Sequence, residues 1–195
     1  MDADQHPFID EALPSNAWLT DLRDAEGYVL TEENVDVVLR LGCGIERVSA
    51  RSIIGSMQNI AKYLAAVRLA SYSLELRLPV SEVKLGRYIS STRDGVLRLN
   101  ERKLLDALLT AAGISLRQLD TMARAVSSAI VEISSTRLDQ VVHGKDCIKL
   151  LTIQFRALGA SDVVDAGPLL WSSFKRERVA EFPVLNEVVN FLIKA

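Results

Sequence analysis

One stretch of the chain, residues 52–76, constrains the fold class more than any other feature. Its apolar residues recur at alternating spacings of four and three, which keeps them on one face of an α-helix. This seam consists of Ile53, Met57, Ile60, Leu64, Val67, Ser71 and Leu74, and it is widened by Ile54, Ala61, Ala65, Leu69, Tyr72 and Leu76. A face this broad is typical of the central helix of a bundle. The face predicted to be exposed to solvent carries Gln58, Lys62, Arg68 and Glu75.

Helix start and stop signals predict further helices on both sides of this stretch. Thr31 and Asn100 are good N-caps for the segments after them, which end at Gly42 and Gly113. Ser115 and Gln118 have the spacing of a capping box for a second broad-faced helix over 116–133. The other expected helices run from Ser15 or Asn16 to about Gly27, from 146 to 158 before Gly159, and onward from Pro168 and from Pro183. The sequence therefore predicts an all-α fold, a multi-helix bundle of about seven to nine helices.

Two neighbouring segments fit this helical pattern less well. Residues 93–99, RDGVLRL, alternate after Gly95 and are the one place where a strand or an extended connector is expected. Ser81 opens the preceding segment, SEVKLGRYISS, in which Glu82 and Lys84 are expected to face water as on an exposed helix side.

The pentapeptide ISSTR occurs at Ile89–Arg93 and again at Ile133–Arg137. The residues after each copy also align, with Lys103-Leu104-Leu105 opposite Lys149-Leu150-Leu151 and Gly113 opposite Gly159. One interpretation is a loosely repeated helical hairpin, with an earlier copy opened by Thr31. The other is that capped hairpins resemble each other because they use the same stop signals. Uneven offsets between the copies argue against a solenoid of fixed period.

The chain of 195 residues is long enough to bury a full hydrophobic core. We expect an acidic, extended arm over 1–14 and a single helical domain over 15–195. No apolar stretch approaches the roughly 18 residues that span a bilayer, and the N-terminus has acids where a secretory signal has basic residues. Cys43 and Cys147 lie far apart among apolar neighbours, as expected for reduced, buried thiols. These features predict a cytoplasmic protein with no membrane contact.

The net charge of −2 hides an uneven distribution. Residues 1–36 hold ten acidic residues and one basic residue, whereas residues 37–150 hold seventeen basic and ten acidic ones. The acidic end is expected to dock on basic helices, of its own chain or of a neighbour, with Phe8, Ile9 and Leu13 as apolar anchors. Alternatively the basic body binds the phosphates of nucleic acid. The candidate contacts are Arg87, Arg93, Arg98, Arg102, Lys103, Arg117 and Arg124. A solvated surface of mixed charge would explain the same distribution without any partner.

Residue patterns typical of catalysis are weak. His143 and Cys147 could form a thiol–imidazole pair or part of a metal site, but no CxxC or HExxH spacing supplies further ligands. LGCGIERV contains GxG after a helix instead of a strand, and GxxxxGK[ST] does not occur, so no cofactor is expected. Residues 108–125 have the outline of a helix-turn-helix, with Arg117, Gln118 and Arg124 near the start of the second helix. The broad apolar face of that helix leaves little of it free to enter a groove of DNA.

These observations favour a binding function over a catalytic one. We expect a non-enzymatic helical protein that acts through protein contacts and self-associates through its acidic arm and arginine-rich body. Its expected partner is another copy of the chain. The alternative is a nucleic-acid-binding protein, of nucleocapsid type or a helix-turn-helix regulator, that uses the basic middle region. No catalytic, cofactor-binding or metal-ligating residue is predicted.

Overall fold

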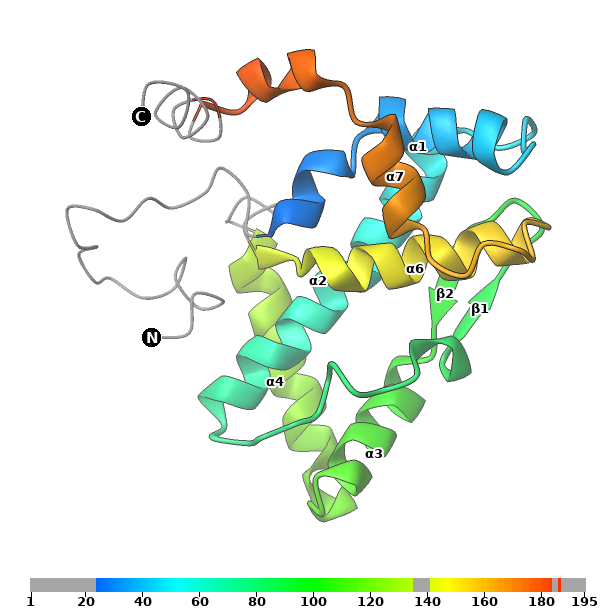
Figure 1. The fold of residues 1–195 in the computed structure, drawn as a ribbon. Helices are drawn as coiled ribbons and strands as arrows, with labels where there is room; N and C mark the ends of the chain where they lie inside the picture. The colour runs from blue at the N-terminus through cyan, green and yellow to red at the C-terminus, as the bar shows by residue number, and fades with distance from the viewer. Residues whose placement is uncertain (1–23, 135–140, 184–185, 187–195) are drawn as a thin grey trace.

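The computed structural model describes residues 24–134, 141–183 and 186. They form a mainly helical molecule (Figure 1), which confirms the helical class. The α-helices are α1 (Glu32–Val37), α2 (Ala50–Ser73), α3 (Glu101–Ala111), α4 (Leu119–Ser134), α6 (Gly144–Ala157) and α7 (Gly167–Ser173). Single-turn and short helical elements are η2 (Ala25–Val29), η3 (Val38–Gly42), η4 (Leu85–Arg87), η5 (Leu116–Gln118) and η6 (Arg176–Glu181). With six α-helices in the described ranges, the expected count of seven to nine is not confirmed.

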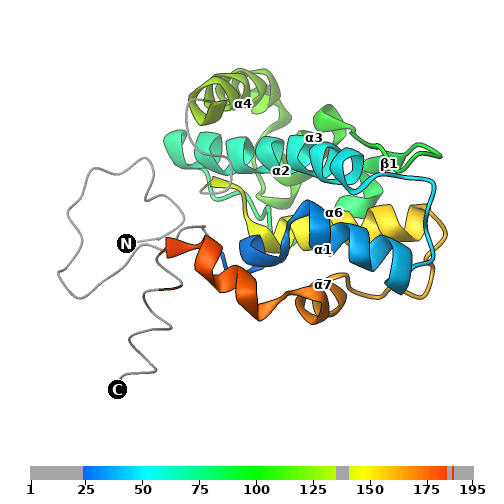
Figure 2. The ribbon, with the colours of Figure 1, turned by 90° about the horizontal axis from the view of Figure 1, so that it is seen from above.

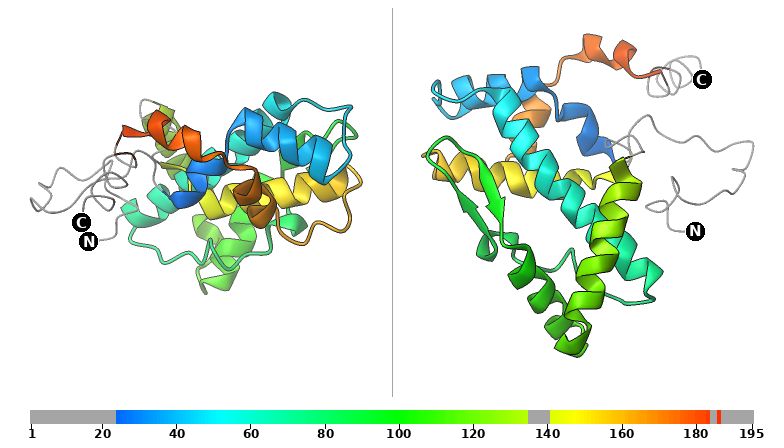
Figure 3. Two further views of the ribbon diagram at one scale, coloured as in Figure 1. Left: turned by 45° about the horizontal axis from the view of Figure 1, so that its top comes forward. Right: turned by 180° about the vertical axis from the view of Figure 1, so that it is seen from behind.

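Helix α2 is the centre of the molecule, as its broad apolar face predicts. It packs against α4, α6 and α1, and the view from behind shows α4 crossing it (Figure 3). The predicted seam is buried apart from the half-buried Leu74. Two expectations were wrong: Tyr72 is 62% exposed, and Arg68 lies mostly inside, paired with a buried carboxylate of α6. Seen from above, α6 lies between α2 and α7 (Figure 2), so the fold has a helix on each side of α6.

A two-stranded antiparallel hairpin interrupts the helices. Strands β1 (Ile89–Ser91) and β2 (Leu97–Leu99) pair with Ile89 opposite Leu99, so residues 93–99 include the expected strand. The segment from Ser81 to Ser91 is not the expected helix; it forms turns, η4 and β1, although Glu82 and Lys84 do face water. The reason lies in tertiary contacts, because buried polar groups of α2 and α6 bind the hairpin backbone.

These contacts meet at the hairpin turn. Ser56 Oγ accepts a hydrogen bond of 2.6 Å from Leu97 N, and Gln154 Nε2 donates to the carbonyl of Gly95 at 2.9 Å. Gly95 has φ +76°, and a Cβ there would lie 2.9 Å from Ile53 Cδ1. The turn therefore needs glycine both for its backbone conformation and for its close approach to the core.

The glycine stop signals at Gly113 and Gly159 work as predicted, whereas Gly27, expected to end a helix, lies inside η2. Gly113 and Gly159 both have positive φ, and in each case the next residue donates to a carbonyl five residues earlier. This is the Schellman arrangement, which satisfies the last carbonyls of α3 and α6. Thr31 and Asn100 cap α1 and α3 through their side-chain oxygens, at Asn34 N and Lys103 N. Helix ends are thus encoded locally in this chain.

Other local expectations need correction. Ser115 accepts from Arg117 N instead of forming the capping box with Gln118, and the turn it opens, η5, leaves Leu116 half exposed. The buried stripe of α4 is narrow: Met122, Val126, Ala129 and Ile133. Ile89–Ser91 of the first ISSTR copy form strand β1, whereas Ile133 and Ser134 of the second copy end α4, so the described residues of the two copies differ in structure. The predicted arm over 1–14, with Phe8, Ile9 and Leu13, and the helix after Pro183 lie outside the described residues.

Candidate functional site

An open groove of ≈ 840 Å³ runs along one face of α6. Its floor side chains are three or four residues apart, so they share a helix face. They are Lys145, Ile148, Lys149, Thr152, Ile153 and Arg156. One wall is the segment 81–86, and the other runs from Val164 to Trp171 at the start of α7. We call this feature the α6 groove.

Polar side chains of α6 hold both walls in place. Lys149 Nζ donates to the carbonyl of Ser81 at 3.2 Å. On the other side, Arg156 donates to the carbonyls of Val163 and Val164 at 2.6 and 2.8 Å. Thr152 Oγ1, which is buried, accepts from Ala166 N at 3.0 Å. The groove therefore belongs to the folded structure and is not an accidental gap between loops.

The end of the groove near the start of α6 is closed by η2. Glu26 of η2 lines it there, and Asp24 Oδ2 accepts a hydrogen bond of 2.6 Å from Gly144 N. A Cβ on Gly144 would lie 2.7 Å from Glu26 Cβ, so glycine at this position allows η2 to approach. Figure 1 shows η2 beside the N-terminal end of α6, so the segment before Asp24 joins the described fold at this end.

The groove combines apolar surface with cations. Trp171 is 45% and Val164 80% exposed, and both line the groove. Lys145, Lys149 and Arg156 lie along the floor and Lys84 on one wall, while Glu26, Glu82 and Asp165 lie on the walls. Among residues 24–134 and 141–183, none of the four cations forms an ion pair. The floor is thus basic, and its charges have no carboxylate partner in the described fold.

The seven basic residues predicted as phosphate contacts are all exposed, but only three of them share one site. Arg87, Arg98 and Lys103 line a hollow of ≈ 530 Å³ between the hairpin and the start of α3, together with Glu101. We call it the basic hollow. Arg102 faces a different hollow, between α3 and α4, and Arg93 lies in the hairpin turn. Arg117 and Arg124 belong to η5 and α4 and line neither of these hollows.

The groups at the N-terminal end of α6 include the residues weighed for catalysis. His143 Nδ1 lies 2.8 Å from Asp24 Oδ2, and Cys147 lines a small cavity of ≈ 80 Å³. Burial, with a smaller effect of Asp146 and Asp24, raises the pKa of the Cys147 thiol, which disfavours the thiolate needed for nucleophilic attack. In the part of the chain that the structure describes, no three His, Cys, Asp or Glu side chains are grouped to hold a metal ion. This arrangement instead ties η2 to α6.

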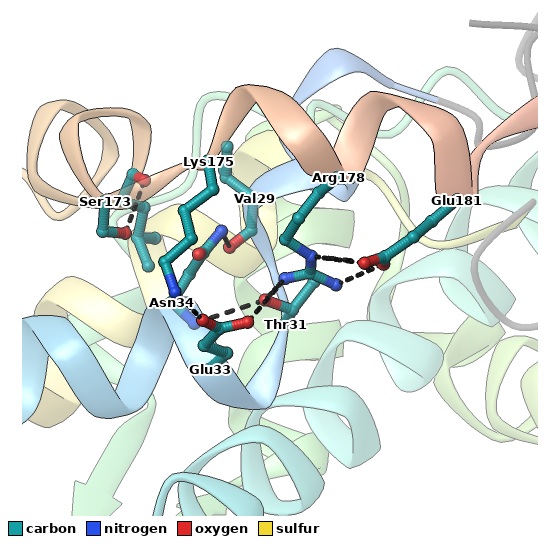
Figure 4. A network of polar contacts seen from close by, with 9 residues as sticks. Val29, Thr31, Glu33, Asn34, Ser173, Lys175, Arg178 and Glu181 are labelled. Atoms are coloured by element: carbon teal, nitrogen blue, oxygen red, sulfur yellow. Dashed lines mark hydrogen bonds and ion pairs between the residues drawn. The ribbon is translucent and has the colours of Figure 1, made fainter. Parts of the chain in front are cut away.

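A second polar network holds the C-terminal side of the molecule (Figure 4). Residues 175–182, here called the C-terminal strap, lie over the start of α1. Arg178 donates to Thr31 Oγ1 at 2.6 Å and to Glu181, and Lys175 pairs with Glu33. The Lys175 hydrogen bond lowers the pKa of the Glu33 carboxyl, and that of Arg178 lowers the pKa of Glu181. Phe182 adds an edge-to-face contact with Tyr28 at 4.6 Å between ring centroids. The strap follows α7 directly and so fixes the far end of the groove wall.

The α6 groove was not predicted from the sequence. Its signal was present in part, because Lys145, Ile148, Lys149 and Ile153 repeat at helical spacing on one face. The walls carry no such signal, since they come from segments far apart along the chain. Comparisons with protein-family models, with curated proteins and with solved structures gave no significant match. No described helix combines the length and the apolarity needed to cross a bilayer.

Proposed function

We propose that this chain is a non-enzymatic assembly protein that binds an apolar, acidic protein segment in its α6 groove and self-associates through that contact. The observation that carries this proposal is the combination of an exposed apolar surface, at Trp171 and Val164, with groove-floor cations that form no ion pair among the described residues. Apolar contact supplies affinity in such grooves, and charge complementarity supplies orientation and selectivity.

The dimensions of the groove suit a short peptide segment. From Lys145 to Arg156 the floor spans about 17 Å along the helix axis. An extended segment of about five or six residues has this length. Acidic side chains in the segment would neutralise Lys145 and Lys149, while apolar ones would cover Ile153 and Trp171. Steering by the cations predicts that association weakens as salt concentration rises.

Sedimentation velocity over a concentration series tests this proposal. We expect the wild type to self-associate in the micromolar range and Lys145→Glu/Lys149→Glu to weaken association at least tenfold. The matched control is Arg98→Glu/Lys103→Glu, which makes the same charge change in the basic hollow and should associate like the wild type. A wild type that remains monomeric up to millimolar concentration would contradict the proposal.

A second candidate function is nucleic-acid binding by the basic hollow, because three of the seven predicted contacts meet there. The same two variants test it with the roles reversed. If this function is correct, Arg98→Glu/Lys103→Glu abolishes binding of single- and double-stranded RNA and DNA at low salt, whereas Lys145→Glu/Lys149→Glu retains part of it. Fluorescence anisotropy at several salt concentrations measures this, since phosphate contacts give a steep salt dependence. No binding by the wild type at low salt excludes the candidate.

A further inference from the structure

We infer that the segment bound in the α6 groove is residues 8–13, FIDEAL, of the N-terminal arm of a second copy of this chain. The inference rests on the proposed function and names its binding partner. In a symmetric pair each arm would lie in the groove of the other copy, so one association fills both grooves. Exchange of identical segments between copies is a low-cost route to a closed dimer.

The arm carries acidic and apolar side chains, which complement the basic and apolar surface of the groove. Residues 1–14 contain four acidic residues and no lysine or arginine, and Asp10 and Glu11 stand between the apolar Ile9 and Leu13. Phe8 adds an aromatic ring. The other segment outside the described residues near a chain end, 187–195, contains one acidic and one basic residue and so offers no net charge to the cations of the floor. Charge complementarity therefore selects the N-terminal arm.

The lengths are also compatible. Six extended residues span about 20 Å, close to the 17 Å or so of the groove floor. The arm joins the described fold at Asp24, which is held by Gly144 N at the N-terminal end of α6. The ten residues between Leu13 and Asp24 can extend about 35 Å, enough to carry FIDEAL onto a neighbouring molecule.

Reciprocal charge exchange between arm and groove tests the inference. The arm variant is Asp10→Lys/Glu11→Lys, and the groove variant is Lys145→Glu/Lys149→Glu. Each variant alone should associate at least tenfold more weakly than the wild type, because like charges then meet. An equimolar mixture should recover the association of the wild type. In the mixture the basic arm of the arm variant meets the acidic groove of the groove variant, and the acidic arm of the groove variant meets a basic groove, as in the wild type. Sedimentation velocity of each variant and of the mixture is the measurement.

A matched control makes the same change elsewhere in the arm. Asp2→Lys/Asp4→Lys lies outside FIDEAL and should weaken association less than threefold. Far-ultraviolet circular dichroism and thermal unfolding check that every variant is folded. These controls separate an effect at FIDEAL from a general loss of negative charge in the arm.

Three outcomes would overturn the inference in distinguishable ways. If the groove variant loses association but the arm variant does not, the proposed function stands and the groove binds another segment, such as 184–195. If a chain with all four substitutions recovers but the mixture does not, the arm binds in its own molecule. If the wild type does not associate at any concentration, the proposed function itself fails.

Discussion

Two of the places where polar contacts join distant segments differ in the exposure of their carboxylates to water. Where α2 and α6 cross, Arg68 Nη1 lies 2.6 Å from Asp146 Oδ2, and the Asp146 side chain is only 5% exposed. Where the C-terminal strap meets α1, Glu33, Lys175 and Glu181 are about half exposed. Both places use the same carboxylate–cation chemistry. The two arginines are similarly buried, with Arg68 18% and Arg178 15% exposed, so the difference lies in the carboxylates. Water competes for the carboxylates of Glu33 and Glu181 much more than for that of Asp146, so disruption of the two places should have different consequences.

The largest effect is expected when the buried pair is broken from one side. Asp146→Ala leaves the mostly buried Arg68 guanidinium without its carboxylate and should lower the free energy of unfolding by about 3–5 kcal/mol. Replacing both partners, as in Arg68→Met/Asp146→Leu, should restore most of that loss because no charge remains unpaired. Urea unfolding followed by circular dichroism measures both values. A double variant as unstable as Asp146→Ala would show that the pair itself, and not the unpaired charge, determines stability.

The next largest loss of stability is expected at the hairpin turn, where Gly95 lies against the hydrophobic core. Gly95→Ala places a Cβ against Ile53 and Leu158 at a backbone position with positive φ. It should therefore lower the free energy of unfolding by about 2–4 kcal/mol. Gly113→Ala is the matched comparison: its φ is also positive, but no atom lies within 4 Å of the added Cβ. We expect it to cost about 1 kcal/mol. Equal costs in chemical denaturation would mean that the turn shifts freely away from the core.

Breaking the strap should have a smaller and more local effect. Arg178→Ala removes the hydrogen bond to Thr31 and the pair with Glu181, which we expect to reduce stability by about 1 kcal/mol. Hydrogen exchange should increase over residues 175–182 and at the start of α1, while the amides of α2 keep their protection. Arg40→Ala, which breaks the exposed pair with Asp36, is the control and should leave the strap unchanged. Loss of protection throughout α2 would contradict this separation.

The mildest test of the strap is a change of pH. The folded-state pKa of Glu33 and of Glu181 lies below the usual value of 4.5, so their contribution is complete above that pH. It is lost as the pH falls through the folded-state pKa, because the protonated carboxyls no longer attract Lys175 and Arg178. After correction for intrinsic rates, exchange over 175–182 should be faster at about pH 3.5 than at about pH 6. Glu33→Gln/Glu181→Gln should remove most of this difference, and an unchanged difference would exclude these two carboxyls as its cause.

The parts of the fold that could be predicted are those encoded by neighbouring residues. The caps at Thr31 and Asn100 and the glycine stop at Gly113 depend on contacts within a few residues, and the buried face of α2 follows from the spacing of its apolar residues. The hairpin was predicted only in its second strand. The groups that hold it, Ser56 at Leu97 N and Gln154 at the Gly95 carbonyl, come from helices far away along the chain. Arg68 was predicted to lie on the solvent-exposed face of its helix because no local signal pairs it with Asp146, a residue far along the chain. The α6 groove is non-local for the same reason.

The α6 groove also has a consequence for the order of events during synthesis. Its lining includes Glu26 near one end of the described chain and Trp171 near the other. A nascent chain can form α2 and its neighbours early, but it has no complete groove until the residues around Trp171 have left the ribosome. If the proposed function is correct, partly synthesised chains on one messenger RNA cannot bind one another through this groove before the residues around Trp171 have emerged.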